Sequence, residues 1–273
     1  MAKKTRPKIG LALGSGGSRG LAHIGIIEIL ENNNIPIDYI AGSSAGAVIG
    51  GIYAATKNIE IARQLISSNT WGKVFDFLTD FSGFDGGIIR GDKMSNFLKK
   101  NLTIRDFKEL LIPFSALATN IESGETEILN KGDFFSALQA SFSIPLLFKP
   151  IRREGKLLVD GGLSQPVPVQ AVRQMGADIV IGVNLDHYLH QPQKYKTVHI
   201  PMLVGPLLDI ARYHLAEKDT RLSDIIVAPR LHDSSLLGIE NFLDGKKIIA
   251  EGTRAMQEKI EDVKKIIKQK SEL

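Results

Sequence analysis

A serine flanked by glycines stands out in the segment Gly42-Ser43-Ser44-Ala45-Gly46. The pattern G-x-S-x-G, with an apolar segment before it and small residues after it, is typical of a sharp strand-to-helix turn that exposes a serine hydroxyl. Gly42 and Gly46 remove Cβ atoms that would clash in such a turn. The spacing assigns the nucleophile to Ser44 and not to its neighbour Ser43. A glycine-rich turn without catalytic role is the alternative.

A second glycine-rich stretch follows the first apolar segment and reads Gly14-Ser15-Gly16-Gly17-Ser18-Arg19-Gly20. Its amides can turn toward one anion, and the dipole of the following helix adds to the attraction. A tetrahedral oxyanion formed at Ser44 is one such anion, and each amide that holds it typically contributes about 100- to 1000-fold in rate. A dinucleotide pyrophosphate is a second, although G-x-G-x-x-G counted from Gly14 puts Arg19 at the third glycine. A structural turn is the third reading.

A carboxylate followed by two glycines, Asp160-Gly161-Gly162, comes directly after a short apolar segment. A carboxylate in this place lies at the carboxyl edge of a parallel sheet, where the active sites of open α/β folds gather. The tripeptide alone favours a simpler reading, in which the aspartate closes an Asx turn.

A nucleophilic serine needs a base, and histidine is the usual one. The chain has six histidines. His23 falls within the first expected helix and is interpreted as structural. A triad in the order Ser…Asp…His could take its histidine from His187, His199 or His232, none of which stands in a local motif.

The elements that must position these residues alternate between strand and helix, which predicts a central, mostly parallel sheet flanked by helices. Expected strands are 9–13, 39–41, 114–120, 126–129, 157–159, 179–185 and 225–228, the third and fourth being candidates for a pair. Expected helices are 21–32, 47–56, 57–69, 92–102 with Asp92 as N-cap, 133–140 capped by Asp133, 167–175, 207–219 and 246–268. Residues 71–91 are expected to form a loop or lid, in which Phe75, Phe77, Phe81, Phe84, Ile88 and Ile89 cover an acyl site or pack in the core.

The amino-acid composition and charge exclude several kinds of site and partner. The 273 residues include no cysteine, which excludes disulfides, a cysteine nucleophile and thiolate metal sites. The net charge of +4 equals the four basic residues Lys3, Lys4, Arg6 and Lys8, so the rest of the chain shows no nucleic-acid footprint. These four face water or touch an anionic membrane surface. No secretory signal and no apolar run of 18 residues is seen, so we expect a cytoplasmic protein.

Three motifs together, Leu13–Gly25, Gly42–Gly46 and Asp160–Gly162, closely resemble the patatin-like phospholipase family in residues, order and separation. Segments 140–145 and 181–184 also look like prokaryotic members. The resemblance covers roughly residues 9–185. It implies a patatin-like three-layer fold, with residues 9–185 as the catalytic core and residues 186–273 as an extension packed on the same domain.

The resemblance further implies a Ser–Asp dyad without a catalytic histidine. Ser44 is then the nucleophile and Asp160 the proton acceptor. Amides around Gly16 and Gly17 form the oxyanion hole, and Arg19 steadies their loop. One departure is Ser15, which stands where the family usually has glycine and puts the loop conformation, though not the number of amides, in question.

The expected function is that of a serine lipid acyl hydrolase of the phospholipase A, lysophospholipase or esterase type, acting through an acyl-enzyme. An acyltransferase that uses the same acyl-enzyme and a non-catalytic acyl-lipid binding protein are the alternatives. The expected partner is a phospholipid or other fatty-acyl ester, with peripheral contact at the inner membrane face. No metal or other cofactor is expected, because backbone amides stabilise the charge that a Lewis acid otherwise would.

Overall fold

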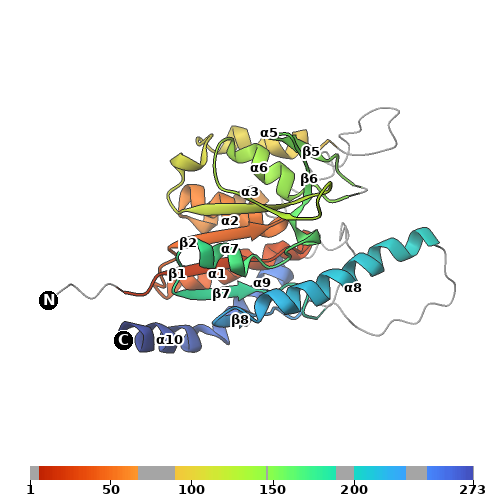
Figure 1. Ribbon diagram of the computed structural model, residues 1–273. Helices are drawn as coiled ribbons and strands as arrows, with labels where there is room; N and C mark the ends of the chain where they lie inside the picture. The colour runs from red at the N-terminus through yellow and green to blue at the C-terminus, as the bar shows by residue number, and fades with distance from the viewer. Residues whose placement is uncertain (1–5, 67–89, 146, 189–199, 232–244, 273) are drawn as a thin grey trace.

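The structure is a computed structural model that describes residues 6–66, 90–145, 147–188, 200–231 and 245–272, built around a sheet of eight strands (Figure 1). The strands are β1 (Ile9–Leu13), β2 (Tyr39–Ser43), β3 (Phe114–Asn120), β4 (Thr126–Leu129), β5 (Ile151–Arg153), β6 (Lys156–Asp160), β7 (Ile179–Val183) and β8 (Ile225–Val227). They are ordered β5-β6-β3-β2-β1-β7-β8, with β4 paired to β3.

Pairings among β3, β2, β1, β7 and β8 are parallel, whereas those that involve β4, β5 or β6 are antiparallel. The expectation of a mostly parallel sheet is therefore confirmed. Strand β8, from the last third of the chain, extends the same sheet beside β7.

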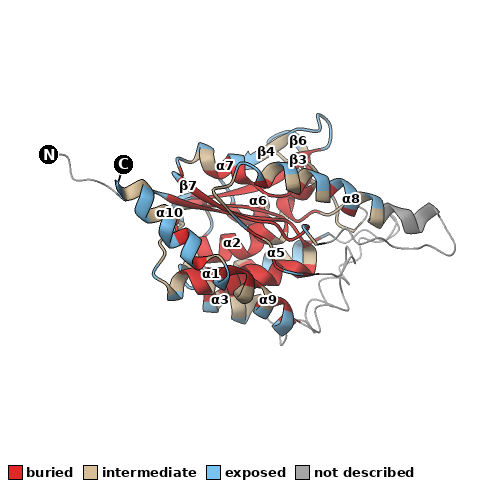
Figure 2. Ribbon diagram, turned by 90° about the horizontal axis from the view of Figure 1, so that it is seen from below, coloured by how far each residue is buried: buried red, intermediate tan, exposed pale blue. Residues whose placement is uncertain are grey.

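Helices cover both faces of this sheet (Figure 2). They are α1 (Ala22–Asn32), α2 (Ala45–Thr56), α3 (Ile59–Ile66), α5 (Asp92–Asn101), α6 (Phe134–Ser141), α7 (Val169–Gln174), α8 (Ile200–Thr220), α9 (Gly245–Gln257) and α10 (Ile260–Glu272), with 3-10 turns η1 (Gly17–Leu21), η2 (Phe107–Glu109) and η3 (Gly161–Leu163). Helices α1, α2, α3 and α9 lie on one face, and α7 and α8 lie on the other. This arrangement gives the three layers that were expected.

Side-chain size differs between the two faces because successive residues of a strand point to opposite sides. In β1, Leu11 and Leu13 join the large core cluster with α1, α2 and α9, whereas Ala12 joins the smaller cluster with α7. A Cβ at Gly10 would lie 2.0 Å from Cγ1 of Val172. Small residues on this face therefore let α7 approach the strand closely.

Helix α1 near the start of the chain and α9 near its end pack side by side on one face of the sheet and meet through glycines. A Cβ on Gly25 of α1 would lie 2.3 Å from the carbonyl oxygen of Ile249, and one on Gly252 of α9 would lie 2.0 Å from that of Ala22. Because these obstacles are backbone atoms, neither helix could move aside without losing contact. Glycine at both places thus fixes α9 against α1.

Three expectations need correction. The single helix expected over 246–268 is two helices, because α9 packs on α1 while Lys270 near the end of α10 reaches Asp224 beside β8 (Nζ–Oδ1 3.1 Å). The N-cap of α5 is Gly91, and Asp92 is its first residue. Strand β5 was not expected, since its three residues are too few for a periodic pattern. The proposed lid residues between 71 and 89 lie outside the described residues.

Candidate active site

Ser44 occupies the turn between β2 and α2 and has φ 54° and ψ −119°. A positive φ is uncommon for a residue with a side chain, and such local strain is typical of functional turns. Glycine is required on both sides, since a Cβ at Gly42 would lie 2.4 Å from the carbonyl oxygen of Gly46, and one at Gly46 would lie 2.2 Å from that of Leu13. The predicted strand-turn-helix context of Ser44 is therefore present.

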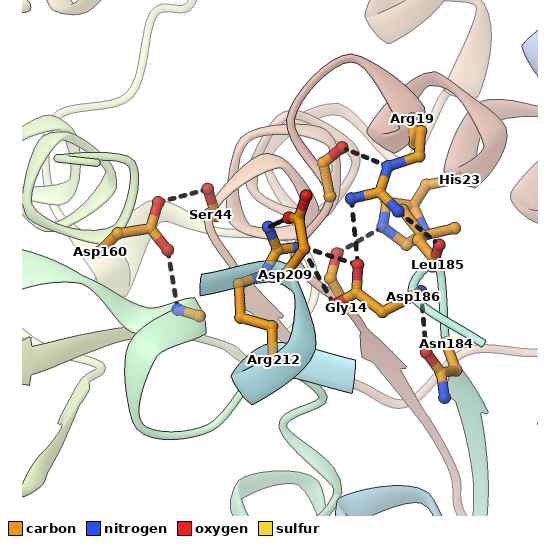
Figure 3. A network of polar contacts seen from close by, with 12 residues as sticks. Gly14, Arg19, His23, Ser44, Asp160, Asn184, Leu185, Asp186, Asp209 and Arg212 are labelled. Atoms are coloured by element: carbon orange, nitrogen blue, oxygen red, sulfur yellow. Dashed lines mark hydrogen bonds and ion pairs between the residues drawn. The ribbon is translucent and has the colours of Figure 1, made fainter. Parts of the chain in front are cut away.

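Strand β3 brings Asp160 to Ser44. Its Leu117 pairs with Ser43 at the end of β2, and the next residue, Ala118, pairs with Asp160 at the end of β6. The Ser44 Oγ donates to Asp160 Oδ2 at 2.5 Å, although the two residues are 116 positions apart (Figure 3). Both side chains are buried, with 4% and 5% of their surface exposed.

The second carboxylate oxygen of Asp160 is held by the turn that follows it. The Gly162 amide donates to Oδ1 at 2.7 Å, so the Asx turn expected from the tripeptide is also present. A Cβ at Gly161 would lie 2.3 Å from the Leu117 carbonyl oxygen, which explains the first glycine of the motif. With Oδ1 fixed in this way, Oδ2 faces Ser44.

Burial raises the pKa of Asp160 to about 6, although the hydrogen bonds from Ser44 and Gly162 oppose the shift. A carboxylate with this pKa is a better proton acceptor near neutral pH than an ordinary aspartate with a pKa of about 4. The pair can therefore transfer a proton from the serine hydroxyl to the carboxylate.

The glycine-rich loop after β1 uses some of its amides for structure and leaves others free. Gly14 N donates to the Val183 carbonyl at 3.2 Å, and Ser15 N donates to the Pro166 carbonyl at 2.9 Å. Within the described part of the chain, the amides of Gly16 and Gly17 have no such acceptor. These two N–H groups belong to residues that line one pocket with Ser44, and they are therefore available to an anion there.

Arg19 and Gly20 contribute to the loop in a different way. Arg19 Nε donates to the Gly16 carbonyl at 3.2 Å, and Nη1 donates to the Leu185 carbonyl at 3.0 Å. A Cβ at Gly20 would lie 2.4 Å from the Cβ of Ala45, the residue after the serine. Both residues therefore hold the loop against its neighbours, and the Arg19 amide is used within the loop, where it donates to the Gly16 carbonyl at 3.1 Å.

His23 also supports this loop. Its Nε2 lies 2.8 Å from the Gly14 carbonyl oxygen, and burial lowers its pKa to about 4. The ring is therefore neutral and donates to Gly14, as expected of a structural histidine. Of the candidates for a triad, His187 contacts Glu217 (Nδ1–Oε1 2.7 Å), while His199 and His232 lie outside the described residues.

A pocket opens at the dyad. Its walls combine the polar loop residues with apolar side chains from later segments: Ser15, Gly16, Gly17, Ser44, Ile144, Pro145, Asp160, Gly162, Leu163, Leu208 and Arg212. Two of these, Leu208 and Arg212, come from α8. No sequence motif singled them out, because they stand in an ordinary amphipathic segment whose place is set only by tertiary packing.

The described residues contain neither a metal-binding cluster nor a membrane-spanning helix. Among them, no group of three or more histidine, aspartate or glutamate side chains is arranged to hold a metal ion. Within the same residues, no helix combines the length and the apolar character that crossing a bilayer requires.

Comparison with known proteins adds to this geometry. The model of the patatin-like phospholipase family matches residues 11–173. A Mycobacterium tuberculosis protein named as an uncharacterized NTE family protein is 37% identical over 180 residues, which are 66% of this chain and 49% of that protein. Lysophospholipase NTE1 of Scheffersomyces stipitis is 31% identical over 185 residues, 65% of this chain and 12% of the fungal protein. The match thus spans about half the mycobacterial relative and a small part of the fungal one.

Among solved structures, VipD from Legionella pneumophila has a similar fold. The TM-score is 0.60 at 13% identity, over 94% of this chain and 67% of that one. At this identity the likeness concerns the fold alone. Since the family model covers more than half of the sequence, the chain belongs to the patatin-like phospholipase family.

Proposed function

We propose that the chain is a serine lipid acyl hydrolase of the phospholipase A, lysophospholipase or esterase type. One observation carries the proposal: the 2.5 Å contact between Ser44 Oγ and Asp160 Oδ2, buried beside the free amides of Gly16 and Gly17. Membership of the patatin-like phospholipase family and the lysophospholipase name of the fungal relatives support the same reaction class.

In the first step, Ser44 Oγ attacks the carbonyl carbon of a fatty-acyl ester while its proton moves to Asp160 Oδ2. The carbonyl oxygen becomes an oxyanion, which accepts hydrogen bonds from the amides of Gly16 and Gly17. When the tetrahedral intermediate collapses, the alcohol leaves with the proton from Asp160, and the acyl group stays on Ser44.

In the second step, water takes the place of the alcohol. Asp160 removes a proton from the water as it attacks the acyl-enzyme, and the same two amides hold the second oxyanion. The fatty acid leaves, and the proton on Asp160 returns to Ser44 Oγ. Because the amides stabilise the charge that develops, this route requires no cofactor.

The pocket walls suit an acyl substrate. Ile144, Pro145, Leu163 and Leu208 surround the polar end of the pocket with apolar surface. On the same helix as Leu208, the side chains of Leu207 and Ile210 are 61% and 42% exposed. Exposed apolar residues beside a lipid site favour peripheral contact with a membrane, from which a phospholipid or related ester is taken.

A fluorophosphonate probe tests the nucleophile, because it reacts with an activated serine and leaves a stable adduct. We expect mass spectrometry to find the adduct on Ser44, and we expect Ser44→Ala to abolish it. Ser43→Ala is the matched control, since the Ser43 hydroxyl is buried next door without a hydrogen-bond partner in the described residues. Labelled Ser43, or no labelling of the folded protein, would contradict the proposal.

Analysis of the products then separates hydrolysis from transfer. With a fatty-acyl ester and an added alcohol such as glycerol, a hydrolase releases free fatty acid. An acyl group recovered on the glycerol instead would identify an acyltransferase. Binding of the ester without either product would identify an acyl-lipid binding protein.

A further inference from the structure

Four buried charges form a cluster that reaches the pocket and joins three separate segments of the chain. Arg19 belongs to the loop after β1, Asp186 follows β7, and Asp209 and Arg212 belong to α8. All four are at least nine-tenths buried. The two arginines balance the two aspartates, so the cluster as a whole is neutral.

Asp186 is the centre of this cluster (Figure 3). It accepts from Arg212 Nη2 with both oxygens, at 2.7 and 3.0 Å, and its Oδ1 lies 3.0 Å from Arg19 Nη2. Arg19 in turn donates to the carbonyl of Gly16. A continuous series of contacts therefore runs from α8 to the loop that presents the free amides.

Stability alone is a weak reason for this arrangement. Removing charged groups from water is costly, and apolar residues of similar size often give equal or greater stability than a buried ion pair. The Asp186 carboxylate is, however, held by two arginines, with Arg212 Nη2 on both oxygens and Arg19 Nη2 on Oδ1, and charge-assisted contacts of this kind fix distance and orientation. The cluster therefore provides positional precision behind the loop.

Arg212 has a second role, because it also lines the pocket together with Ser44 and Asp160. Its Nε finds no partner among the described residues, and its ion pair with Asp209 is long, with Nη1 3.5 Å from Oδ1. Its firm contacts are thus those with Asp186. Its positive charge stands near Asp160, where negative charge is held before proton transfer.

We propose that Asp186 and Arg212 are positioning residues of the proposed hydrolase: acting through Arg19, they hold the Gly16 and Gly17 amides in place, and Arg212 sets a positive charge beside Asp160. This inference rests on the proposed function. It extends the functional unit to α8, which lies beyond residues 11–173 that the family model matches.

The charge of Arg212 shifts the pKa of Asp160 in one direction. The groups that act on Asp160 are the Ser44 hydroxyl, the Gly162 amide, Arg212 from α8 and Asp186 after β7. Arg212 lowers the pKa of Asp160, and Asp186 raises it. Loss of Arg212 removes the first effect and leaves Asp186 less neutralised. Both changes raise the pKa of Asp160 above about 6.

The test measures kcat and KM against pH for Arg212→Gln and Arg212→Lys with a fatty-acyl ester. For Arg212→Gln we expect kcat to fall about 10- to 100-fold with little change in KM, as on loss of contacts that act only in the transition state. The acid limb of the kcat/KM profile, near pH 6 in the parent protein, moves to higher pH. For Arg212→Lys the limb stays in place while kcat falls, because lysine keeps the charge, whereas its shorter side chain places no nitrogen where Nη2 contacts Asp186.

Arg254→Gln is the matched control. Like Arg212 with Asp209, Arg254 is a helical arginine that forms an ion pair with an acidic residue three positions before it. Its Nη2 lies 2.6 Å from Glu251 Oε2. It lies on α9, so its loss should leave kcat and the acid limb unchanged. Equal effects of the two Gln substitutions would overturn the proposal, as would an unchanged acid limb in folded Arg212→Gln.

The lysine variant keeps the test decisive if Arg212→Gln does not fold. Parent-like kcat in folded Arg212→Lys would overturn the positioning role, because the reach and shape of the Arg212 guanidinium at Asp186 would then be dispensable. A parent protein that neither labels at Ser44 nor releases fatty acid would instead refute the proposed function. The two failures are therefore distinguishable.

Discussion

Two turns leave neighbouring parallel strands at the same edge of the sheet, and they contribute to the site in opposite ways. The turn after β2 presents a side chain, the hydroxyl of Ser44, on a backbone forced to φ 54°. The loop after β1 presents backbone, the amides of Gly16 and Gly17, and its nearby side chains serve to hold it. The turn after β2 depends on an atom that a side chain adds, the hydroxyl oxygen of Ser44. The loop after β1 depends on the absence of side chains, which leaves its backbone amides accessible.

This difference decides what each turn tolerates. At Ser44 the proposed chemistry would be lost with one oxygen, whatever the conformation. In the glycine loop the amides belong to every residue type, so substitutions act through conformation and close contacts. Gly46 links the two turns, because a Cβ there would meet the carbonyl oxygens of Leu13 at 2.2 Å and Gly14 at 2.7 Å.

The largest effect is expected from removing the functional atoms of the β2 turn and its partner. Ser44→Ala should lower kcat/KM by about 10³- to 10⁶-fold, because no nucleophile remains. Asp160→Asn should lower it by about 10²- to 10⁴-fold, because asparagine cannot accept the proton. Steady-state hydrolysis of a fatty-acyl ester measures both, and Ser43→Ala should keep parent activity. A folded, fully active Asp160→Asn would refute the dyad.

A smaller effect, on stability, is expected where the two turns touch. Gly46→Ala places a methyl group against two backbone carbonyls that cannot rotate away. We expect the free energy of unfolding in urea to fall by about 3 kcal/mol or more.

Gly205→Ala on α8 is the control for this substitution, since nothing apart from its chain neighbours lies within 4 Å of its added Cβ. It should change the free energy of unfolding by less than about 1 kcal/mol, because the gain in helix propensity is opposed by Pro206, which disfavours a helical conformation in a preceding residue that carries a Cβ. Parent stability in Gly46→Ala would show that the two turns are less tightly joined than the contact distances imply.

The third prediction concerns the folding stability that is lost when the buried Asp160 carboxylate ionises. Folded Asp160 keeps its proton up to about pH 6, whereas the unfolded chain releases it near pH 4. The folded state therefore binds more protons in this window, and its stability falls as pH rises through it. Asp160→Asn removes the effect.

The free energy of unfolding of Asp160→Asn, relative to the parent, should grow by up to about 3 kcal/mol between pH 4 and pH 7. Asp219, whose pKa burial also raises to about 6, titrates in both proteins and cancels in the comparison. A difference that stays constant across this range would mean that Asp160 ionises as it does in the unfolded chain.

Local signals predicted much of the fold. The strand pair 114–120 and 126–129 is confirmed as antiparallel β3 and β4, and Asp133 caps α6 by accepting from Ser136 N at 2.5 Å. Such features depend on residues close in sequence. The sequence does not predict the break at 258–259, because no glycine or proline marks it, whereas the helices on either side have different partners in the fold: α9 packs on α1, and Lys270 of α10 reaches Asp224.

In the candidate site, too, some features follow from residues close in sequence and others only from tertiary packing. Ser44 and Asp160 stand in short motifs, so each could be proposed from its neighbours, whereas their hydrogen bond depends on how β3 aligns β2 and β6. Asp186 and Arg212 stand in no motif and meet only because α8 packs beside the end of β7. The division of the glycine loop into bonded and free amides likewise depends on partners, such as Pro166, that are distant in sequence.

The glycine contact between α1 and α9 has a consequence for biogenesis. Gly25 and Ile249 are more than 200 residues apart, so the helix that follows the glycine loop cannot reach its final packing until α9 has emerged from the ribosome. Contacts of such long range are slow to form. An apolar face of α1 therefore stays uncovered for most of translation, and shielding by a chaperone during that interval would protect the nascent polypeptide from aggregation.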